Sequence, residues 1–195
     1  SFASRGEIIL LAEITAHYGG VYASHLRSES DTLIEALDEF LSVCEHTLCR
    51  AQYSHIKAAG PRNWHKVAEV RQRMNDARAK GVELYGDRYP YNASCTDLAT
   101  ILLPNDALSG GPAAIVARLG DRATRAELKR RIMDREQIDT DGPGWYDRVM
   151  ISAVHDTSLR GAEGRTLAKW AEQSNHEGDP LDAAFDLIIA DGALT

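Results

Sequence analysis

The sequence has little cysteine and no long apolar run, and each shortage excludes a class of protein. Its three cysteines, Cys44, Cys49 and Cys95, are odd in number and show no CxxC spacing, which argues against a disulfide framework and a structural zinc knuckle. No apolar run approaches the ~20 residues that cross a bilayer, and residues 1–6 lack the apolar region of a signal peptide. We therefore predict a cytoplasmic protein with reduced, partly buried thiols and no membrane partner.

Basic residues are too few and too scattered to form a nucleic-acid-binding surface. The sequence has 22 Lys and Arg against 29 Asp and Glu, which gives a formal net charge of −7. Because phosphate binding needs clustered cations, this balance argues against nucleic acid as a partner. A content of 44% hydrophobic and 26% charged residues is typical of a globular protein, and 195 residues are enough for one ordinary domain with a core.

Three β-favouring runs recur at intervals of about 30 residues, the length that one strand and one covering helix occupy in a βαβ unit. The runs cover residues 19–27, 51–57 and 82–91, and helical patterns with one apolar face lie between them. Strand and helix thus alternate over residues 6–91. This alternation favours a parallel α/β sheet, open or closed.

Helix start and stop signals bound the segments between these runs. Ser4 and Glu7 have the spacing of a capping box, so we expect the chain to open with a helix, partway through a βα repeat. The other candidate boundaries are the N-caps Ser30 or Asp31, the first-turn residues Pro61 or Asn63, and the terminator Gly81.

The pattern changes after the third run. Residues 92–150 mix Asn, Ser, Gly and Pro with short helical pieces, which indicates an insertion. Thr124 and Glu127 form another possible capping box, at the start of a basic helix. The remaining predicted elements are a short strand at 148–154, a helix at 166–173, and a last helix capped by Asp179 and Pro180.

Two of the seven histidines stand at predicted strand tips, where parallel α/β proteins assemble their active sites. His25 follows the first run and His55 follows the second, so we interpret both as candidate metal ligands. Zinc takes three or four N, S or O ligands, and two histidines do not complete such a site. The spacing leaves the third ligand open, with His155 and Asp156 as candidates.

Long ordered segments of the sequence resemble the N-acyl-D-amino-acid deacylases, or D-aminoacylases, of the amidohydrolase superfamily. Together they span most of the chain, and they are far more specific than a single short motif. The segments are GGVYASHLRSE at 19–29, SHIKAAG at 54–60 with Asn63-Trp64, DRYPY at 87–91 with Ala93, Ser94 and Thr96, VMISAV at 149–154, and DPLDAA at 179–184.

The resemblance implies an α/β fold, a partial TIM-type (β/α) barrel of about strands five to seven with their helices, plus a mostly helical insertion. Residues 1–91 would be the βα units of the barrel. Residues 92–155 would be the insertion, which covers the active-site mouth, and residues 156–195 would be a helical segment leading to the last barrel strand.

The resemblance also assigns site residues. His25 and His55 correspond to zinc ligands on the fifth and sixth strands. Lys57 matches a lysine that contacts the carboxylate of the substrate, and Tyr89, with Tyr91 close by, matches a tyrosine with the same task. Read without the family, Lys57 would be a solvated cation and the two tyrosines would be packing at the rim.

The activity implied is removal of the acyl group from a small-molecule N-acyl-D-amino acid, by attack of metal-bound hydroxide on the amide. The family's other metal ligands and its aspartate general base are expected outside this chain, so we expect no catalytic residue within it and no turnover by the chain alone. Arg27 and Glu29 also match the family, and we expect a salt bridge that holds their loop. A barrel that is cut open exposes strand edges, so we expect a homo-oligomer.

Two other interpretations remain open at the level of sequence. One is a different metal-dependent amidohydrolase, such as a cyclic-amide hydrolase. The other is a non-catalytic α/β domain that binds a ligand, in which His25 and His55 are structural. The separation of the two imidazoles distinguishes this last interpretation from the metal-dependent ones, because two ligands of one zinc place their nitrogens within roughly 3–4 Å of each other.

Overall fold

The computed structural model describes residues 3–136, 144–174 and 179–194. The chain forms two compact units, Ser1–Asn92 and Ala93–Thr195. The first unit is α/β and carries the sheet, whereas the second is built mainly of helices within the described ranges.

Three short parallel strands form the sheet of the first unit, in the order β1-β2-β3. Tyr53, the last residue of β2, pairs with Ser24 at the end of β1 and with Gly86 at the end of β3, so all three strands end level. The prediction of a parallel α/β sheet is confirmed. The strands are β1 (Val21–Ser24), β2 (Arg50–Tyr53) and β3 (Leu84–Gly86).

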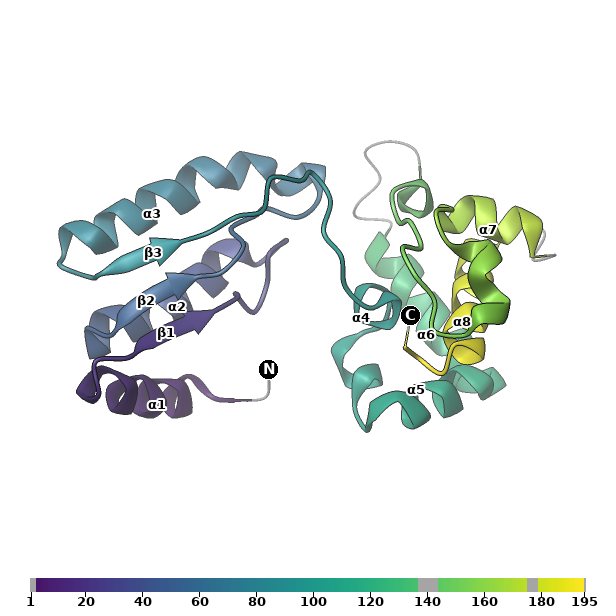
Figure 1. Ribbon diagram of the computed structural model, residues 1–195, viewed down its shortest axis with the longest axis horizontal. Helices are drawn as coiled ribbons and strands as arrows, with labels where there is room; N and C mark the ends of the chain where they lie inside the picture. The colour runs from purple at the N-terminus through teal and green to yellow at the C-terminus, as the bar shows by residue number, and fades with distance from the viewer. Residues whose placement is uncertain (1–2, 137–143, 175–178, 195) are drawn as a thin grey trace. The chain divides into compact units, whose positions relative to one another are not determined.

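A helix precedes each strand of this sheet, and the three helices lie side by side (Figure 1). The first packs against β1 and the second helix, and the second packs against the third. The expected capping box is present, since the Ser4 hydroxyl accepts from the Glu7 N–H and the Glu7 carboxylate accepts from the Ser4 N–H. The helices are α1 (Arg5–His17), α2 (Leu33–Thr47) and α3 (Val67–Ala79), the last preceded by the 3-10 helix η1 (Pro61–Lys66).

The core of the first unit lies between the sheet and the inner faces of α2 and α3. Apolar residues at helical spacing on α2 are fully or nearly fully buried, which explains why this helix is fixed against the sheet. The largest contributors from the helices are Leu33, Leu37, Phe40, Leu41, Val70 and Met74, and those from the strands are Ala51, Tyr53 and Leu84.

The predicted N-cap of α2 is wrong by one or two residues. The helix begins at Leu33, and its N-cap residue is Thr32, which makes no side-chain capping bond. Ser30 and Asp31 lie before that position. Asp31 instead binds the guanidinium of Arg62, a partner 31 residues away, so its carboxylate is directed away from the helix end.

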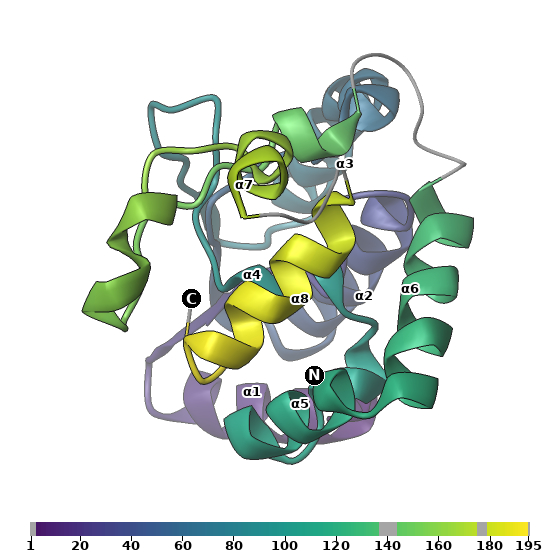
Figure 2. The ribbon, with the colours of Figure 1, turned by 90° about the vertical axis from the view of Figure 1, so that its right-hand side faces the viewer.

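The helices of the second unit gather around α8, which Figure 2 shows passing through its middle. One face of α8 is completely buried and includes Ala184, Phe185 and Ile188. The expected cap is confirmed, because the Asp179 carboxylate accepts from two N–H groups in the first turn and Pro180 occupies that turn. The helices are α4 (Leu98–Leu102), α5 (Gly111–Gly120), α6 (Arg122–Glu136), α7 (Leu167–Gln173) and α8 (Pro180–Ala190); the 3-10 helices are η2 (Asn105–Leu108), η3 (Trp145–Asp147) and η4 (Thr157–Ala162).

A network of ion pairs joins α6 to α8. Arg125 binds Asp182 at 3.0 Å and Asp186 at 2.5 Å, and Lys129 binds Asp182 at 2.6 Å as well as Asp179. The basic helix predicted from the sequence therefore packs against acidic residues within its own unit. These cations stabilise the helix pair and do not form a free basic surface.

Two local predictions in the second unit are wrong. The helix α6 starts at Arg122, and its first turn is capped by Asp121, whose carboxylate accepts from the Thr124 N–H at 2.8 Å. The expected strand at 148–154 is a loop with one isolated bridge, between Met150 and Thr166. The segment opposite this loop turns directly into α7, so no longer ladder forms.

The three cysteines form no disulfide bond with one another, and two of them are buried. Cys44 and Cys49 lie inside the first unit, whereas Cys95 is exposed. Burial raises the pKa of the Cys44 thiol to about 12, which keeps it protonated and unreactive at neutral pH. None of the described helices is long and apolar enough to cross a membrane.

Candidate metal and substrate site

The level ends of the three parallel strands bring polar side chains to one edge of the sheet. His25 directly follows β1, His55 stands two residues after β2, and Asp87 directly follows β3. Because parallel strands deliver their carboxyl ends to the same edge, residues about 30 positions apart in the sequence become neighbours here.

The imidazoles of His25 and His55 face each other. The distance between His25 Nδ1 and His55 Nε2 is 3.3 Å, and the rings are stacked with centroids 5.3 Å apart. The backbone of His55 has a left-handed conformation, with φ of 43°, which is uncommon for a residue other than glycine. The chain thus adopts an unfavourable backbone at the position that directs this ring toward its partner.

Asp87 holds the strained residue in place. One of its carboxylate oxygens accepts from the His55 backbone N–H at 2.6 Å, and the other accepts from Gln52 Nε2 at 2.6 Å. The backbone N–H of Ile56 donates to the Asp87 carbonyl at 2.8 Å. The hydrogen bond from the His55 backbone, followed by the one from Gln52, lowers the pKa of Asp87 below its ordinary value.

The two residues expected to bind a substrate carboxylate lie beside the imidazole pair. Lys57 Nζ is 2.7 Å from His55 Nδ1 and lies 5.6 Å from the centre of the Tyr89 ring. The Tyr89 ring in turn lies 6.5 Å from the His55 ring. Tyr91, the neighbour considered from sequence, is 70% exposed. The structure therefore brings His25, His55, Lys57 and Tyr89 into one cluster.

Arg27 and Glu29 do form ion pairs, but with different partners. Arg27 binds Glu39 on α2 at 2.6 Å, which fixes the loop after β1 to the helix that follows. Glu29 turns into the cluster, where Lys57 Nζ is 2.7 Å and His55 Nδ1 is 3.0 Å from its carboxylate. Sequence reasoning missed this second contact, because no spacing along the chain relates Glu29 to residues 55 and 57.

The third metal ligand stays unassigned. Across the described ranges, no group of three or more His, Cys, Asp and Glu side chains is arranged to hold a metal ion. The candidates His155 and Asp156 lie in the second unit, where their backbone N–H groups donate to the Asp191 carboxylate. The Asp156 side chain accepts from the Ser158 N–H at the start of η4.

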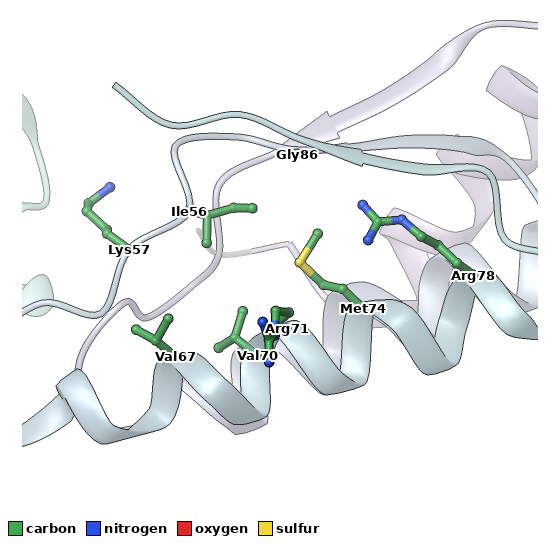
Figure 3. Close-up of a pocket in the computed structure, with 8 residues that line it drawn as sticks. All are labelled: Ile56, Lys57, Val67, Val70, Arg71, Met74, Arg78 and Gly86. Atoms are coloured by element: carbon green, nitrogen blue, oxygen red, sulfur yellow. The ribbon is translucent and has the colours of Figure 1, made fainter. Parts of the chain in front are cut away.

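A pocket of about 270 Å³ lies between the end of the sheet and α3 (Figure 3). Ile56 and Met74 point toward each other across it, and Gly86 forms part of its roof next to the Ile56 side chain. Neither imidazole lines this pocket, but Lys57 of the cluster does. Its lining consists of Ile56, Lys57, Val67, Val70, Arg71, Met74, Arg78 and Gly86.

Comparison with known proteins gives the cluster a context. No protein-family model matches the sequence. Among curated proteins, an N-acyl-D-glutamate deacylase from Alcaligenes xylosoxydans xylosoxydans is 39% identical over 105 residues, which is 54% of this chain and 21% of that protein. An N-acyl-D-aspartate deacylase from the same organism is 34% identical over 99 residues, which is 50% of this chain and 20% of that protein.

A solved structure is similar over a larger share of the chain. The crystal structure of N-acyl-D-glutamate deacylase from Bordetella bronchiseptica, complexed with zinc and a phosphonate inhibitor that mimics the tetrahedral intermediate, matches with a TM-score of 0.66. The match has 25% identity and covers 95% of this chain and 30% of the deacylase. Over about half of its length, this chain is therefore similar in sequence to a segment of an N-acyl-D-glutamate deacylase and of an N-acyl-D-aspartate deacylase. It spans about a fifth of the length of the curated deacylases that it matches.

Proposed function

We propose that this chain is a central segment of a zinc-dependent enzyme that removes the acyl group from N-acyl-D-amino acids. In this proposal the sheet β1-β2-β3 supplies strands five to seven of a TIM-type barrel. Residues 92–155 form the insertion over the active-site mouth, and residues 156–195 lead to the last strand. The observation that carries the proposal is the facing pair of imidazoles at the strand ends, in a chain whose relatives are deacylases of this kind.

The separation of the two imidazole nitrogens fits zinc. Two nitrogens that each lie about 2.0–2.1 Å from one tetrahedral zinc are about 3.3 Å apart. The measured distance between His25 Nδ1 and His55 Nε2 is 3.3 Å. These two atoms are therefore our candidate ligands. When bound, zinc would polarise the amide carbonyl and activate water for its hydrolysis.

Lys57 and Tyr89 are our candidates for binding the carboxylate of the substrate. The Lys57 ammonium carries three donors and lies near the face of the Tyr89 ring, so charge and ring together define one side of a site for an anionic group. Because both residues flank His55, a carboxylate held there would place the neighbouring amide close to the imidazole pair. This arrangement would orient the substrate and favour one enantiomer.

Zinc binding tests the metal half of the proposal. We expect the natural protein that contains this sequence to bind zinc, and we expect His25→Ala and His55→Ala each to weaken that binding, because each deletes one of the two proposed ligands. Calorimetric titration with zinc ions measures both. The matched control is His46→Ala, which removes an exposed imidazole that contacts Glu13 at 3.4 Å.

Enzyme activity, measured in the natural protein that contains this sequence, tests the proposed substrate and reaction. We expect release of acetate from N-acetyl-D-amino acids with little release from the L-enantiomers, and loss of that activity in His25→Ala and His55→Ala. Activity that survives in both variants would contradict the assignment of the ligands. Equal turnover of both enantiomers would contradict the assignment of the substrate class.

A further inference from the structure

Glu29 occupies the centre of the cluster, although its position in the sequence gives no sign of it. Its side chain is 22% exposed, as is that of Lys57, and the His55 side chain is 31% exposed. Lys57 Nζ lies 2.7 Å from the Glu29 carboxylate, and His55 Nδ1 lies 3.0 Å from its Oε1. One carboxylate thus contacts both a proposed metal ligand and a proposed substrate-binding cation.

The chemistry of the three groups shows what this contact does. For His55 Nε2 to ligate a metal, the neutral ring must carry its proton on Nδ1, and this N–H must then find an acceptor. Lys57 has three donors and no acceptor, so its 2.7 Å contact with Nδ1 exists only while Nδ1 carries no proton, and a ring that ligates a metal through Nε2 must give this contact up. The Glu29 carboxylate accepts only, and it is within reach of both groups.

We infer that Glu29 is a positioning residue that acts on the metal-binding histidine and on the carboxylate-binding lysine together. It accepts the Nδ1–H of His55, which leaves Nε2 directed at His25 with a free lone pair. It also binds the Lys57 ammonium, and so keeps it near the Tyr89 ring when His55 Nδ1 carries a proton and no longer accepts from Lys57. This inference rests on the proposed function, and it adds a residue to which the resemblance assigns no role.

The ion pair between Arg27 and Glu39 is the control that distinguishes a positioning role of Glu29 from general stabilisation of the loop. Arg27 and Glu39 bind each other at 2.6 Å, and their side chains are 32% and 24% exposed. Both the Glu29 and Glu39 pairs tether the loop after β1, but within the described part of the chain the Glu39 carboxylate pairs with Arg27 and with no member of the cluster. A variant of Glu39 therefore reports the cost of losing a tether without disturbing the cluster.

The experiment compares Glu29→Ala, Glu29→Gln and Glu39→Ala in the natural protein that contains this sequence, with two measurements. The first is the affinity for zinc ions, measured by competition with a chelator. We expect Glu29→Ala to weaken it about 10–100-fold, as is usual when the acceptor behind a metal-binding histidine is removed. The second is the proton–nitrogen NMR signal of the Lys57 ammonium, which we expect to exchange slowly with water only while Glu29 binds it.

Glu29→Gln divides the two roles. Its amide keeps an oxygen that can accept from His55 Nδ1, but it loses the charge that holds Lys57. We therefore expect this variant to retain more of the zinc affinity than Glu29→Ala while the Lys57 signal is lost in both. Glu39→Ala should leave both measurements at the level of the unmodified protein.

Equal effects of Glu29→Ala and Glu39→Ala on both measurements would overturn the inference, because they would reduce Glu29 to a loop tether. This outcome differs from failure of the proposed function. If the unmodified protein binds no zinc, the metal proposal fails, whereas the Lys57 signal still shows whether Glu29 positions the lysine.

Discussion

At the scale of single residues, Asp87 links stability to the geometry of the site. Its carboxylate accepts from the backbone N–H of His55, whose φ is 43°, and from Gln52. A left-handed backbone at a residue other than glycine costs of order 1–3 kcal/mol and persists only where its surroundings impose it. The carboxylate of Asp87 is part of what imposes it on His55.

We expect Asp87→Asn to lower the free energy of unfolding at neutral pH by about 1 kcal/mol or less, because the group is exposed to solvent and its interactions are screened. The pKa of Asp87 is lowered in the folded state from its ordinary value of 3.8. Its contribution to stability is therefore complete above that value and disappears as the pH falls through the lowered pKa.

Urea unfolding from pH 7 down to pH 3 measures this directly. The difference between the unmodified chain and Asp87→Asn should be constant near neutral pH and shrink below about pH 4. Unfolding curves that stay equally far apart over the whole range would show that the charge of Asp87 contributes nothing.

Some residues of the site could be predicted from the sequence, and one could not. His25 and His55 could be nominated from sequence because each follows a β-favouring run at the same interval, and Lys57 and Tyr89 because they lie in segments that resemble deacylases. Glu29 could not be assigned a role, because its partners are 26 and 28 positions away and the contact depends on how two loops fold over one sheet edge.

At the scale of the elements, the residue that ends α2 has a strained backbone that a substitution could relieve. Leu48 follows the helix in the left-handed conformation, with φ of 49° and ψ of 24°, and its N–H donates to the Cys44 carbonyl. Its side chain is 67% exposed, so it gains little from burial. Glycine is the usual residue at this position, because a Cβ atom disfavours the left-handed region.

We expect Leu48→Gly to raise the free energy of unfolding by about 0.5–1 kcal/mol, as the relief of backbone strain exceeds the entropy that glycine adds to the unfolded chain. The midpoint of urea unfolding should rise with an unchanged slope. Leu48→Ala is the control, since it removes the same exposed side chain and keeps the Cβ atom. An equal gain in both variants would trace the effect to the side chain and not to the backbone.

Helix ends were predictable where the capping contact is local. The box of Ser4 and Glu7 and the cap at Asp179 join residues three positions apart or fewer, and both are present. Prediction failed at Asp31, whose carboxylate is engaged by Arg62 from a distant segment. It failed also at Thr124, although the contact there is local, because Asp121, three residues earlier, is a second candidate cap and its carboxylate accepts from the Thr124 N–H.

At the scale of the whole molecule, the alternation of strand and helix over the first unit was readable from periodicity, because each βα step is built from about 30 consecutive residues. Periodicity does not show which further strands, if any, pair with the edges of the sheet. Within the described ranges, β1 and β3 each pair with β2 alone, so the outer edge of each is unpaired. Unpaired edges offer rows of N–H and C=O groups to another chain.

The edges lead to a prediction about association. Val21 on β1 is 48% exposed and Tyr85 on β3 is 53% exposed, so an apolar side chain stands at each edge. We expect the chain to associate with rising concentration, and we expect Val21→Lys and Tyr85→Lys together to shift it toward the monomer, because lysine on an edge strand opposes pairing between chains. Light scattering over a range of concentrations measures the mass.

The control for charge alone is Met133→Lys, at a 41% exposed position on α6 in the second unit. It adds a cation of the same kind away from both strands, so association should persist in it if the strand edges are what pairs. A monomer at all concentrations in the unmodified chain would mean that these edges are protected in solution. Loss of association in Met133→Lys would place the contact in the helical unit, since repulsion would then act there and not along the sheet.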